Sequence, residues 1–274
     1  MSGLKWYGGK GTSAARIVGM MPPHTRYLEP FGGGLSVLCA KPRVELETVN
    51  DLNDRVVNLY RVARDMPDEL IRAVHLTPHA RREVEVAAEV SPDPVEDARR
   101  MVVCCYQSRA MGGMRPSGWR SAYGVGRVPG SMAMMPARNA VQRVCDRLAG
   151  VQVECKDARE VTAQYAHGRV LVYVDPPYCS GERTDAATYA AEAWSIDEHN
   201  EYVEQLLSLD AMVMVSGYTG GPYDRLSDEG WRVVSWESYT SISREQGDSR
   251  TERLWINAAA HASALPLFAQ EGDQ

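Results

Sequence analysis

The most informative stretch of this chain is VLVYVDPPY, residues 170–178. Its first five residues are apolar and mostly β-branched, which is typical of a strand buried on both faces of a parallel sheet. Two prolines follow Asp175, and because proline has no N–H to give to a neighbouring strand, the strand must end there. Asp175 and Tyr178 are therefore predicted at the carboxyl end of a central strand, where open α/β sheets bind their ligands.

A second informative stretch is YLEPFGGGLSV, residues 27–37. It predicts a short strand that ends at Glu29-Pro30, then a glycine turn, then the start of an apolar helix. Glycines let a ligand approach the backbone, and the amino end of a helix favours anionic groups. Because Val37 stands at the third glycine position of the dinucleotide fingerprint, the pattern indicates a nucleotide-type loop but disfavours a nicotinamide oxidoreductase.

Asp51 follows the next predicted strand, residues 44–49. A carboxylate at this place can accept hydrogen bonds from both hydroxyls of a ribose. The alternative is a purely local role in starting the helix predicted over residues 53–65. The glycine loop that precedes Asp51 favours the ribose interpretation.

The remaining pattern predicts an α/β protein with a sheet of six or seven strands. Further strands are expected over residues 151–155, 211–216, 231–236 and 252–258. We expect residues 1–66 and 150–258 to form one catalytic domain and residues 67–149 to form a helical and loop insertion. Residues 259–274 are expected to be a flexible tail.

Charge is distributed unevenly along the 274 residues, of which 44% are hydrophobic. The net charge is −6, yet the segment from Arg99 to Arg147 holds nine arginines and one acid and carries +8, which leaves −14 on the remainder. A basic segment on an acidic body suggests one face for a polyanion. No apolar run is long enough for a membrane span, and the six cysteines show no CxxC pairing, so we expect a reduced, cytoplasmic protein without a metal.

The region from residue 107 to 136 has no clear helix or strand period and contains six glycines. A stretch of this length is either functional or a solvated loop. Arginines interleaved with aromatic residues suit phosphate contacts combined with base contacts or stacking. The candidates for DNA binding are Arg109, Arg115, Trp119, Arg120, Tyr123 and Arg127.

Four motifs occur in a characteristic order: KWYGGK at 5–10, YLEPFGGGLSV at 27–37, VNDLN at 49–53 and DPPY at 175–178. Together they resemble the Dam-like, alpha-type DNA adenine-N6 methyltransferases. The resemblance implies a Rossmann-like methyltransferase sheet, S-adenosylmethionine as cofactor, and methyl transfer to N6 of an adenine flipped out of double-stranded DNA, as in restriction-modification systems. It places SGY at 216–218 and RTERLWIN at 250–257 among the late motifs.

The resemblance also implies roles for individual residues. Asp175, Pro176, Pro177 and Tyr178 would hold the target adenine, Asp51 the ribose hydroxyls, and Asp157 would lie near the cofactor adenine. The full set expected at the cofactor is Trp6, Tyr7, Lys10, Glu29, Pro30, Phe31, Gly32, Gly34, Asp51, Asp157 and Asp175.

Some alternatives stay open at this point. The acceptor could be N4 of cytosine or adenine in RNA, and the chain could be a non-catalytic DNA-binding regulator on the same fold. We expect a monomer in a bacterial or phage-infected cell. The apolar island at residues 264–268 resembles short sliding-clamp-binding peptides, although the usual glutamine is absent, and a disordered tail is the competing interpretation.

Overall fold

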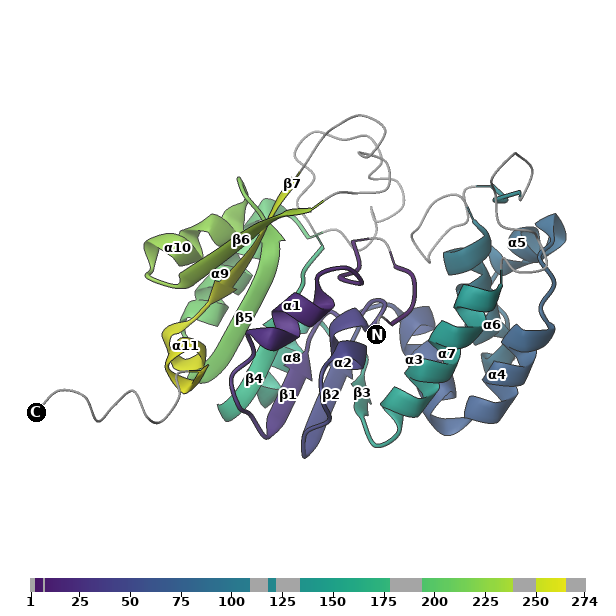
Figure 1. Ribbon diagram of the computed structural model, residues 1–274, viewed down its shortest axis with the longest axis horizontal. Helices are drawn as coiled ribbons and strands as arrows, with labels where there is room; N and C mark the ends of the chain where they lie inside the picture. The colour runs from purple at the N-terminus through teal and green to yellow at the C-terminus, as the bar shows by residue number, and fades with distance from the viewer. Residues whose placement is uncertain are drawn as a thin grey trace, which may run out of the picture.

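A seven-stranded sheet forms the centre of the computed structural model, which describes residues 3–6, 8–108, 118–121, 134–177, 194–238 and 250–264. The strand order is β3-β2-β1-β4-β5-β7-β6, and β7 runs antiparallel to both of its neighbours (Figure 1). This arrangement confirms the predicted Rossmann-like α/β sheet. The strands are β1 (Arg26–Glu29), β2 (Leu46–Asn50), β3 (Gln152–Glu154), β4 (Gly168–Val174), β5 (Ala211–Tyr218), β6 (Arg232–Ser238) and β7 (Arg250–Ile256).

Helices cover both faces of this sheet. They are α1 (Ala14–Gly19), α2 (Ser36–Ala40), α3 (Asp54–Asp65), α4 (Pro67–Leu76), α5 (Arg81–Ala87), α6 (Pro94–Gln107), α7 (Met135–Leu148), α8 (Ala158–Tyr165), α9 (Ile196–Leu207), α10 (Arg225–Asp228) and α11 (Ala258–Ala264), with a short 3₁₀ turn at Pro222–Asp224. Within the described ranges, none of these helices is long and apolar enough to cross a membrane.

The central strands are buried on both faces because their side chains alternate between two hydrophobic cores. In β4, Leu171 and Tyr173 join the core under α1, α2, α3 and α7, whereas Val170, Val172 and Val174 join the core under α8, α9 and α10. A strand with two buried faces must be apolar at every position, which explains the unbroken run that opened the sequence argument. All five strands from β1 to β5 are parallel, so their carboxyl ends meet at one edge.

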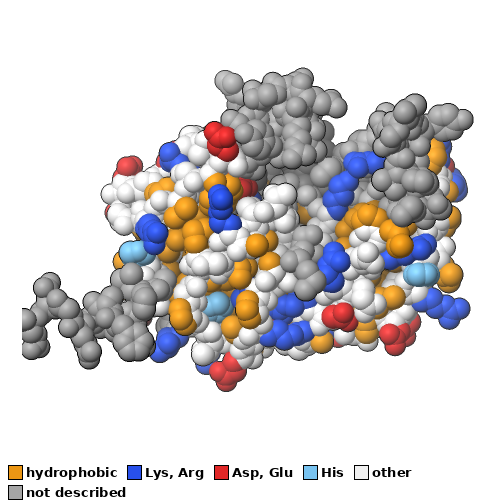
Figure 2. All heavy atoms as spheres, viewed as in Figure 1, with side chains coloured by type: hydrophobic (Ala, Val, Ile, Leu, Met, Phe, Trp, Pro, Cys, Tyr) orange, Lys and Arg blue, Asp and Glu red, His pale blue; other side chains and the backbone are white. Residues whose placement is uncertain are grey.

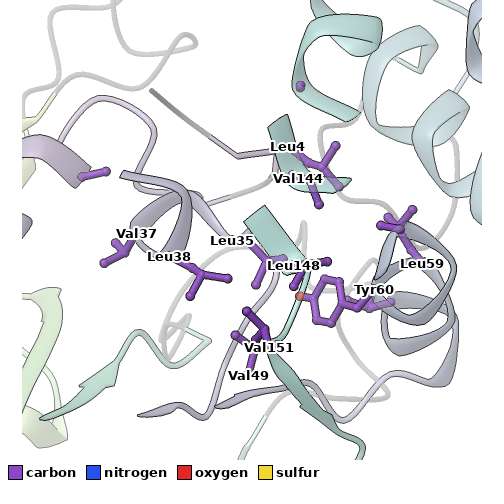
Figure 3. Close-up of a cluster of buried hydrophobic side chains, with 14 of the residues drawn as sticks. Leu4, Leu35, Val37, Leu38, Val49, Leu59, Tyr60, Val144, Leu148 and Val151 are labelled. Carbon is purple, nitrogen blue, oxygen red and sulfur yellow. The ribbon is translucent and has the colours of Figure 1, made fainter. Parts of the chain in front are cut away.

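The helices α4 to α7 form a bundle beside the sheet and pack against α3 (Figure 1). Figure 3 shows how the larger core continues from the sheet into this bundle. Leu35, the N-cap residue of α2, and Leu38 within α2 face Leu148 of α7. A buried ion pair, Arg55 Nη2 to Asp97 Oδ1 at 2.9 Å, ties α3 to α6. The insertion is thus held on the sheet by both apolar and charged contacts.

The structure differs from the sequence-based expectation at two places. Ala258–Ala264 form α11 with Ala260 fully buried, so the beginning of the expected tail is folded, and residues 265–274 lie outside the described residues. Arg147, which was counted in the basic segment expected to face a polyanion, turns inward instead and pairs with Glu47 of β2 at 2.5 Å. Sequence periodicity could not show this, because the acid that draws Arg147 inward comes from a distant strand.

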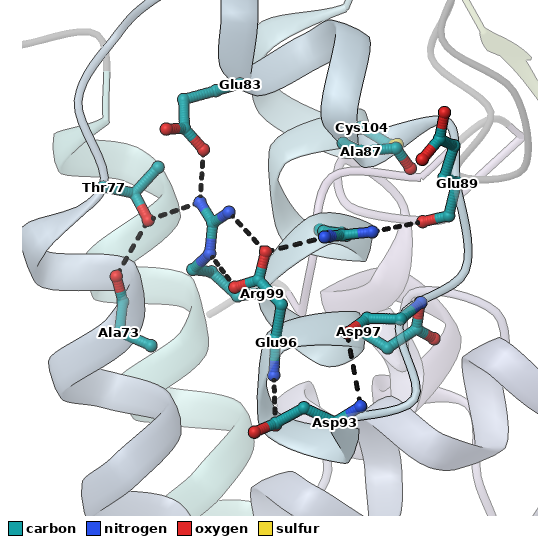
Figure 4. Close-up of polar contacts among 12 residues, drawn as sticks. Ala73, Thr77, Glu83, Ala87, Glu89, Asp93, Glu96, Asp97, Arg99 and Cys104 are labelled. Carbon is teal, nitrogen blue, oxygen red and sulfur yellow. Dashed lines mark hydrogen bonds and ion pairs between the residues drawn. The ribbon is translucent and has the colours of Figure 1, made fainter.

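The basic segment also loses part of its charge to internal ion pairs. Arg99 contacts Glu96 and Glu83, both at 2.6 Å, and Arg100 contacts Glu96 at 2.8 Å (Figure 4). The hydrogen bonds from Arg99 and Arg100 lower the pKa of Glu96 to about 2. The predicted face for a polyanion must therefore rest on arginines other than Arg99, Arg100 and the buried Arg147.

Candidate active site at the carboxyl ends of the central strands

Asp175 lies directly after β4 and is held by two donors. Lys10 Nζ lies 2.8 Å from Asp175 Oδ1, and Ser216 Oγ donates to the same oxygen at 2.9 Å. Ser216 comes from the neighbouring strand β5, whereas Lys10 comes from the N-terminal segment. Two contacts to one oxygen from different directions fix the rotation of the carboxylate, and the side chain remains 18% exposed. The site therefore presents an oriented acceptor that a ligand can reach.

Behind Ser216 lies a second hydroxyl. Tyr173 OH and Ser216 Oγ are 2.9 Å apart, and both side chains are buried. A hydroxyl has one proton, so while Ser216 donates to Asp175, Tyr173 donates to Ser216. This chain of hydrogen bonds connects Asp175 to the interior of the sheet and limits its movement.

Lys10 has an unusual environment for a lysine, since only 2% of its side chain is exposed. Besides Asp175, its ammonium lies 3.5 Å from Glu252 Oε1 on β7 and donates to the carbonyl oxygen of Gly8 at 3.4 Å. The resemblance implied a cofactor contact for Lys10. The structure places the ammonium at Asp175, the residue predicted to receive the target amine.

The glycine loop is covered by the N-terminal segment. A Cβ on Gly33 would lie 2.9 Å from Trp6 Nε1, and one on Gly34 would lie 2.7 Å from Trp6 Cβ. Gly33 also has a φ of +48°, a region that favours glycine. Leu4 N donates to Gly34 O at 2.8 Å and fixes the segment along the loop. Part of the reason for these glycines is thus the close approach of Trp6, in addition to any ligand.

Asp51 joins the glycine loop to the end of β2. Its Oδ2 accepts from Gly33 N and its Oδ1 from Asn53 N, each at 3.0 Å. The helix-capping role belongs to Asn53, whose side chain accepts from Arg55 N and Val56 N. A carboxylate has about four lone-pair sites, so these two bonds do not by themselves exhaust the acceptor capacity of Asp51.

Glu29 ends β1 inside the protein and is 3% exposed. Tyr27 OH donates to Glu29 Oε2 at 2.9 Å. Burial, with a further contribution from the charge of Asp175, raises the pKa of Glu29 to about 8 against the lowering effect of the Tyr27 hydrogen bond. Glu29 and Asp175 therefore belong to one electrostatic site at the ends of β1 and β4.

Asp157 caps α8 and is paired with Arg159. Arg159 Nη2 lies 2.8 Å from Asp157 Oδ2, and this contact lowers the pKa of Asp157. The guanidinium of Arg159 also lies 5.0 Å from the ring of Trp194, which makes a T-shaped contact with Phe31 at 5.3 Å between ring centroids. The predicted residues Asp157 and Phe31 are therefore connected through Arg159 and Trp194.

Two of the DNA-binding candidates lie within the described residues. Trp119 packs on the small core of the insertion, with Arg81 at 5.2 Å and His79 at 5.3 Å from its ring. Arg120 lies close enough to Lys5 to affect its titration. Burial is the main cause that lowers the pKa of Lys5, and the positive charge of Arg120 lowers it further. Lys and Arg side chains are numerous over the centre of the face in Figure 2, between the sheet and the insertion.

Six further predicted residues lie outside the described residues. They are Tyr7, Tyr178, Arg109, Arg115, Tyr123 and Arg127. In the parts that are described, no three His, Cys, Asp or Glu side chains gather as a metal site.

A family model of the D12 class N6 adenine-specific DNA methyltransferases matches residues 6–110 and 126–229. The chain belongs to this family. The match includes the glycine loop, Asp51 and Asp175, and it leaves out residues 111–125 of the region predicted to read DNA. The matched region of this methyltransferase also ends before β6 and β7, so Glu252 lies beyond the matched residues.

The methyltransferase is similar to a Type II methyltransferase of Lactococcus lactis subsp. cremoris, with 25% identity over 227 residues that cover 77% of this chain and 79% of that protein. A solved structure described as a conserved hypothetical protein of Streptococcus pyogenes covers 86% of this chain and 88% of its own at 13% identity. Its TM-score against this structure is 0.30.

Sequence reasoning missed three residues at this site: Tyr173, Ser216 and Glu252. The motifs SGY and RTERLWIN contain Ser216 and Glu252, and the family resemblance placed both motifs late in the chain without roles. For Tyr173 and Ser216 the signal available was a polar group in an otherwise apolar strand, because a buried polar side chain requires a partner; β7, with the sequence RTERLWI, offers no such signal for Glu252.

Proposed function

We propose that this DNA methyltransferase transfers a methyl group from S-adenosylmethionine to N6 of an adenine that is flipped out of duplex DNA. The observation that supports this most directly is the anchored carboxylate of Asp175, held by Lys10 and Ser216 beside the glycine loop. The exocyclic amine of adenine requires oriented hydrogen-bond acceptors, and an anchored carboxylate followed by a stiff Pro-Pro turn provides them.

The residues around the glycine loop suit S-adenosylmethionine, which supplies a methyl group on a positively charged sulfur. Asp175 at the end of β4 places a carboxylate that can balance this positive charge, and Glu29 at the end of β1 lies within its electrostatic reach. Asp51, already bonded to the loop backbone, is suited to accept from the ribose hydroxyls. Phe31 and Trp194 provide aromatic surface near Asp157 for the adenine ring. The chemistry of this set of side chains fits the cofactor that the family implies.

The amine of adenine is a poor nucleophile because its lone pair is delocalised into the ring. We expect Asp175 to accept a hydrogen bond from one N–H of the amine and the carbonyl oxygen of Pro176 to accept one from the other N–H, which localises and directs the lone pair. Pro176 and Pro177 stiffen the turn, so the two acceptors are in place before the amine arrives. Tyr178 is expected to stack on the base. Alignment of amine and methyl group could supply roughly 7–11 kcal/mol of the barrier.

Duplex DNA hides this amine in a stacked pair, and flipping the base costs a few kcal/mol. Phosphate contacts from arginines can offset that cost. We propose that Arg109, Arg115, Trp119, Arg120, Tyr123 and Arg127 contribute to DNA binding, and that the enzyme acts as a modification enzyme of the Type II class, as its Lactococcus relative is named.

The proposal is tested by substituting Asp175→Ala and measuring transfer of tritiated methyl groups to DNA. We expect transfer to fall by at least about a thousandfold, the upper end of losses seen when a preorganised catalytic contact is removed. Cofactor affinity, measured by calorimetry, should stay within about tenfold, because one residue of several in the site is changed. Glu204→Gln, on the exposed outer side of α9, is the matched control.

Separation of the nucleosides after digestion identifies the acceptor. N6-methyladenine from a DNA substrate supports the proposal, and N4-methylcytosine or transfer only to RNA would contradict it. A wild-type protein that binds DNA but transfers no methyl group would indicate a regulator. Full activity of Asp175→Ala would refute the role of the carboxylate.

A further inference from the structure

Glu252 is a buried acid on β7 that the proposed mechanism has not yet used. It is 5% exposed and lies between Tyr218 of β5 and Trp236 of β6 in the register of the sheet. A buried carboxylate is costly unless it is hydrogen-bonded or paired with a cation. Its partners therefore indicate why this position is acidic.

Both oxygens of Glu252 are engaged. Trp236 Nε1 donates to Oε2 at 2.8 Å, and Lys10 Nζ lies 3.5 Å from Oε1. Trp236 is itself covered by Arg16 of α1, whose guanidinium carbon lies 5.4 Å from the centre of the ring. The orientation of the Glu252 carboxylate is thus fixed by the two late strands, and it holds the N-terminal segment through Lys10.

Lys10 is shared unequally between two acids. The distance to Asp175 is 2.8 Å and that to Glu252 is 3.5 Å. One ammonium between two carboxylates leaves the group of three with a net negative charge. If Glu252 lost its charge, the ammonium would be drawn fully onto Asp175 and would compete with the amine protons for the carboxylate.

We propose that Glu252 is a positioning residue for methyl transfer. It draws Lys10 partly away from Asp175, so that Lys10 orients the carboxylate without neutralising it. This inference rests on the proposed role of Asp175. It extends the active site to strands β6 and β7, which lie beyond the residues matched by the family model.

The test compares Glu252→Gln, which keeps the size and removes the charge, with Glu252→Asp, which keeps the charge. We expect kcat for DNA methylation to fall about tenfold in Glu252→Gln, which corresponds to about 1.4 kcal/mol of barrier. The KM values for DNA and S-adenosylmethionine should stay within about twofold, since Glu252 acts on the reacting carboxylate and not on binding. Glu252→Asp should recover most of the rate.

Trp236→Phe provides a second, milder variant because it removes only the indole N–H. A smaller loss of kcat in the same direction is expected. Unchanged kcat in both Glu252→Gln and Trp236→Phe would overturn the proposal. Equal loss in Glu252→Asp and Glu252→Gln, together with a lower Tm, would assign a merely structural role and would overturn it as well.

Asp175→Ala in the same assay separates the two ideas. If Asp175→Ala is inactive while Glu252→Gln works at full rate, only the inference about Glu252 fails. If Asp175→Ala keeps full activity, the proposed function of Asp175 fails first, and the positioning role fails with it. Glu204→Gln again serves as the control for a Glu-to-Gln change at a distance.

Discussion

Two charge clusters in this methyltransferase each contain three side chains but have opposite charge compositions. Lys10, Asp175 and Glu252 combine one cation with two acids, with contacts of 2.8 and 3.5 Å. The second cluster, Lys41, Glu47 and Arg147, combines two cations with one acid, with contacts between 2.5 and 2.6 Å.

The second cluster is tightly closed. Arg147 binds both oxygens of Glu47 and also donates to Leu38 O, and Lys41 binds Glu47 Oε1 and lies over the ring of Tyr27. Burial would raise the pKa of Glu47, but the hydrogen bonds from Arg147 and Lys41 outweigh it and leave that pKa lowered. Such geometry holds α7 on the sheet. The cluster at Asp175 is looser and partly exposed, as a site that must accept a ligand requires.

Breaking the closed cluster should produce the largest change in stability. Glu47→Gln removes the only acid of this cluster and leaves Lys41 and Arg147 buried without a counter-charge. We expect unfolding free energy to fall by about 3–5 kcal/mol, the cost of breaking a buried pair on one side. Urea denaturation measures this, and a loss under about 1 kcal/mol would contradict the structural role.

The pH dependence of stability sharpens the comparison through Glu29, a third buried acid, which has no cation bound to it by a described hydrogen bond. Its pKa is about 8 in the folded protein against an ordinary 4.5. Between these values the folded state keeps a proton that the unfolded chain has lost, so stability falls as pH rises, by roughly 1.4 kcal/mol per unit.

Glu29→Gln cannot titrate and should remove this fall. Urea midpoints at pH 5 and pH 8 should therefore differ less in the variant than in the wild type. An identical pH dependence in both proteins would show that Glu29 is ionised in the fold. Glu47→Gln should not reduce the fall of stability with rising pH, because the pKa of Glu47 is shifted in the opposite direction.

The arginines of the basic segment should also fall into two groups, those that stabilise the fold through ion pairs and those that bind DNA. Arg99 is bound to Glu96 and Glu83, so Arg99→Ala should lower Tm and leave DNA affinity nearly unchanged. Arg115→Ala should leave Tm unchanged, weaken DNA binding and reduce the slope of log affinity against log salt by about one. Fluorescence titrations at several salt concentrations test this, and equal affinity losses in the two variants would contradict it.

The smallest effect is expected at an exposed pair. Arg82 and Glu85 lie one helical turn apart on α5, with 80% and 51% of their side chains exposed. Arg82→Ala should change the free energy of unfolding by no more than about 0.5 kcal/mol. A larger loss would mean that burial is not what separates the strong clusters from the weak ones.

The sequence predicted the sheet well because the relevant information is local. The apolar run before Asp175 and the glycines after Glu29 specify strand ends through backbone chemistry, and the structure places both at one edge. The partners of Arg147 and Lys10 could not be predicted, since Glu47 and Glu252 are distant in sequence and no periodicity connects them. The charge of the insertion was overestimated for the same reason.

Trp119 illustrates a different limit. Its neighbours in sequence suggested stacking on bases, and its role in DNA binding stays a prediction, but the structure shows its ring packed on Val84, Ala87 and Val103. An aromatic residue between arginines has the same appearance in sequence whether it faces a ligand or a small core. Only the fold shows what lies beneath it.

The contact between Lys10 and Glu252 has a consequence for biosynthesis. Lys10 precedes β1, whereas Glu252 stands in β7, which follows β1 to β6 along the chain and is therefore synthesised much later. Domains generally fold during synthesis from the N-terminus, and contacts between distant residues form late. The cluster of Lys10, Asp175 and Glu252 can be completed only when β7 inserts between β5 and β6. A nascent chain that ends before β7 would therefore have Lys10 and Asp175 without the second acid that shares the ammonium.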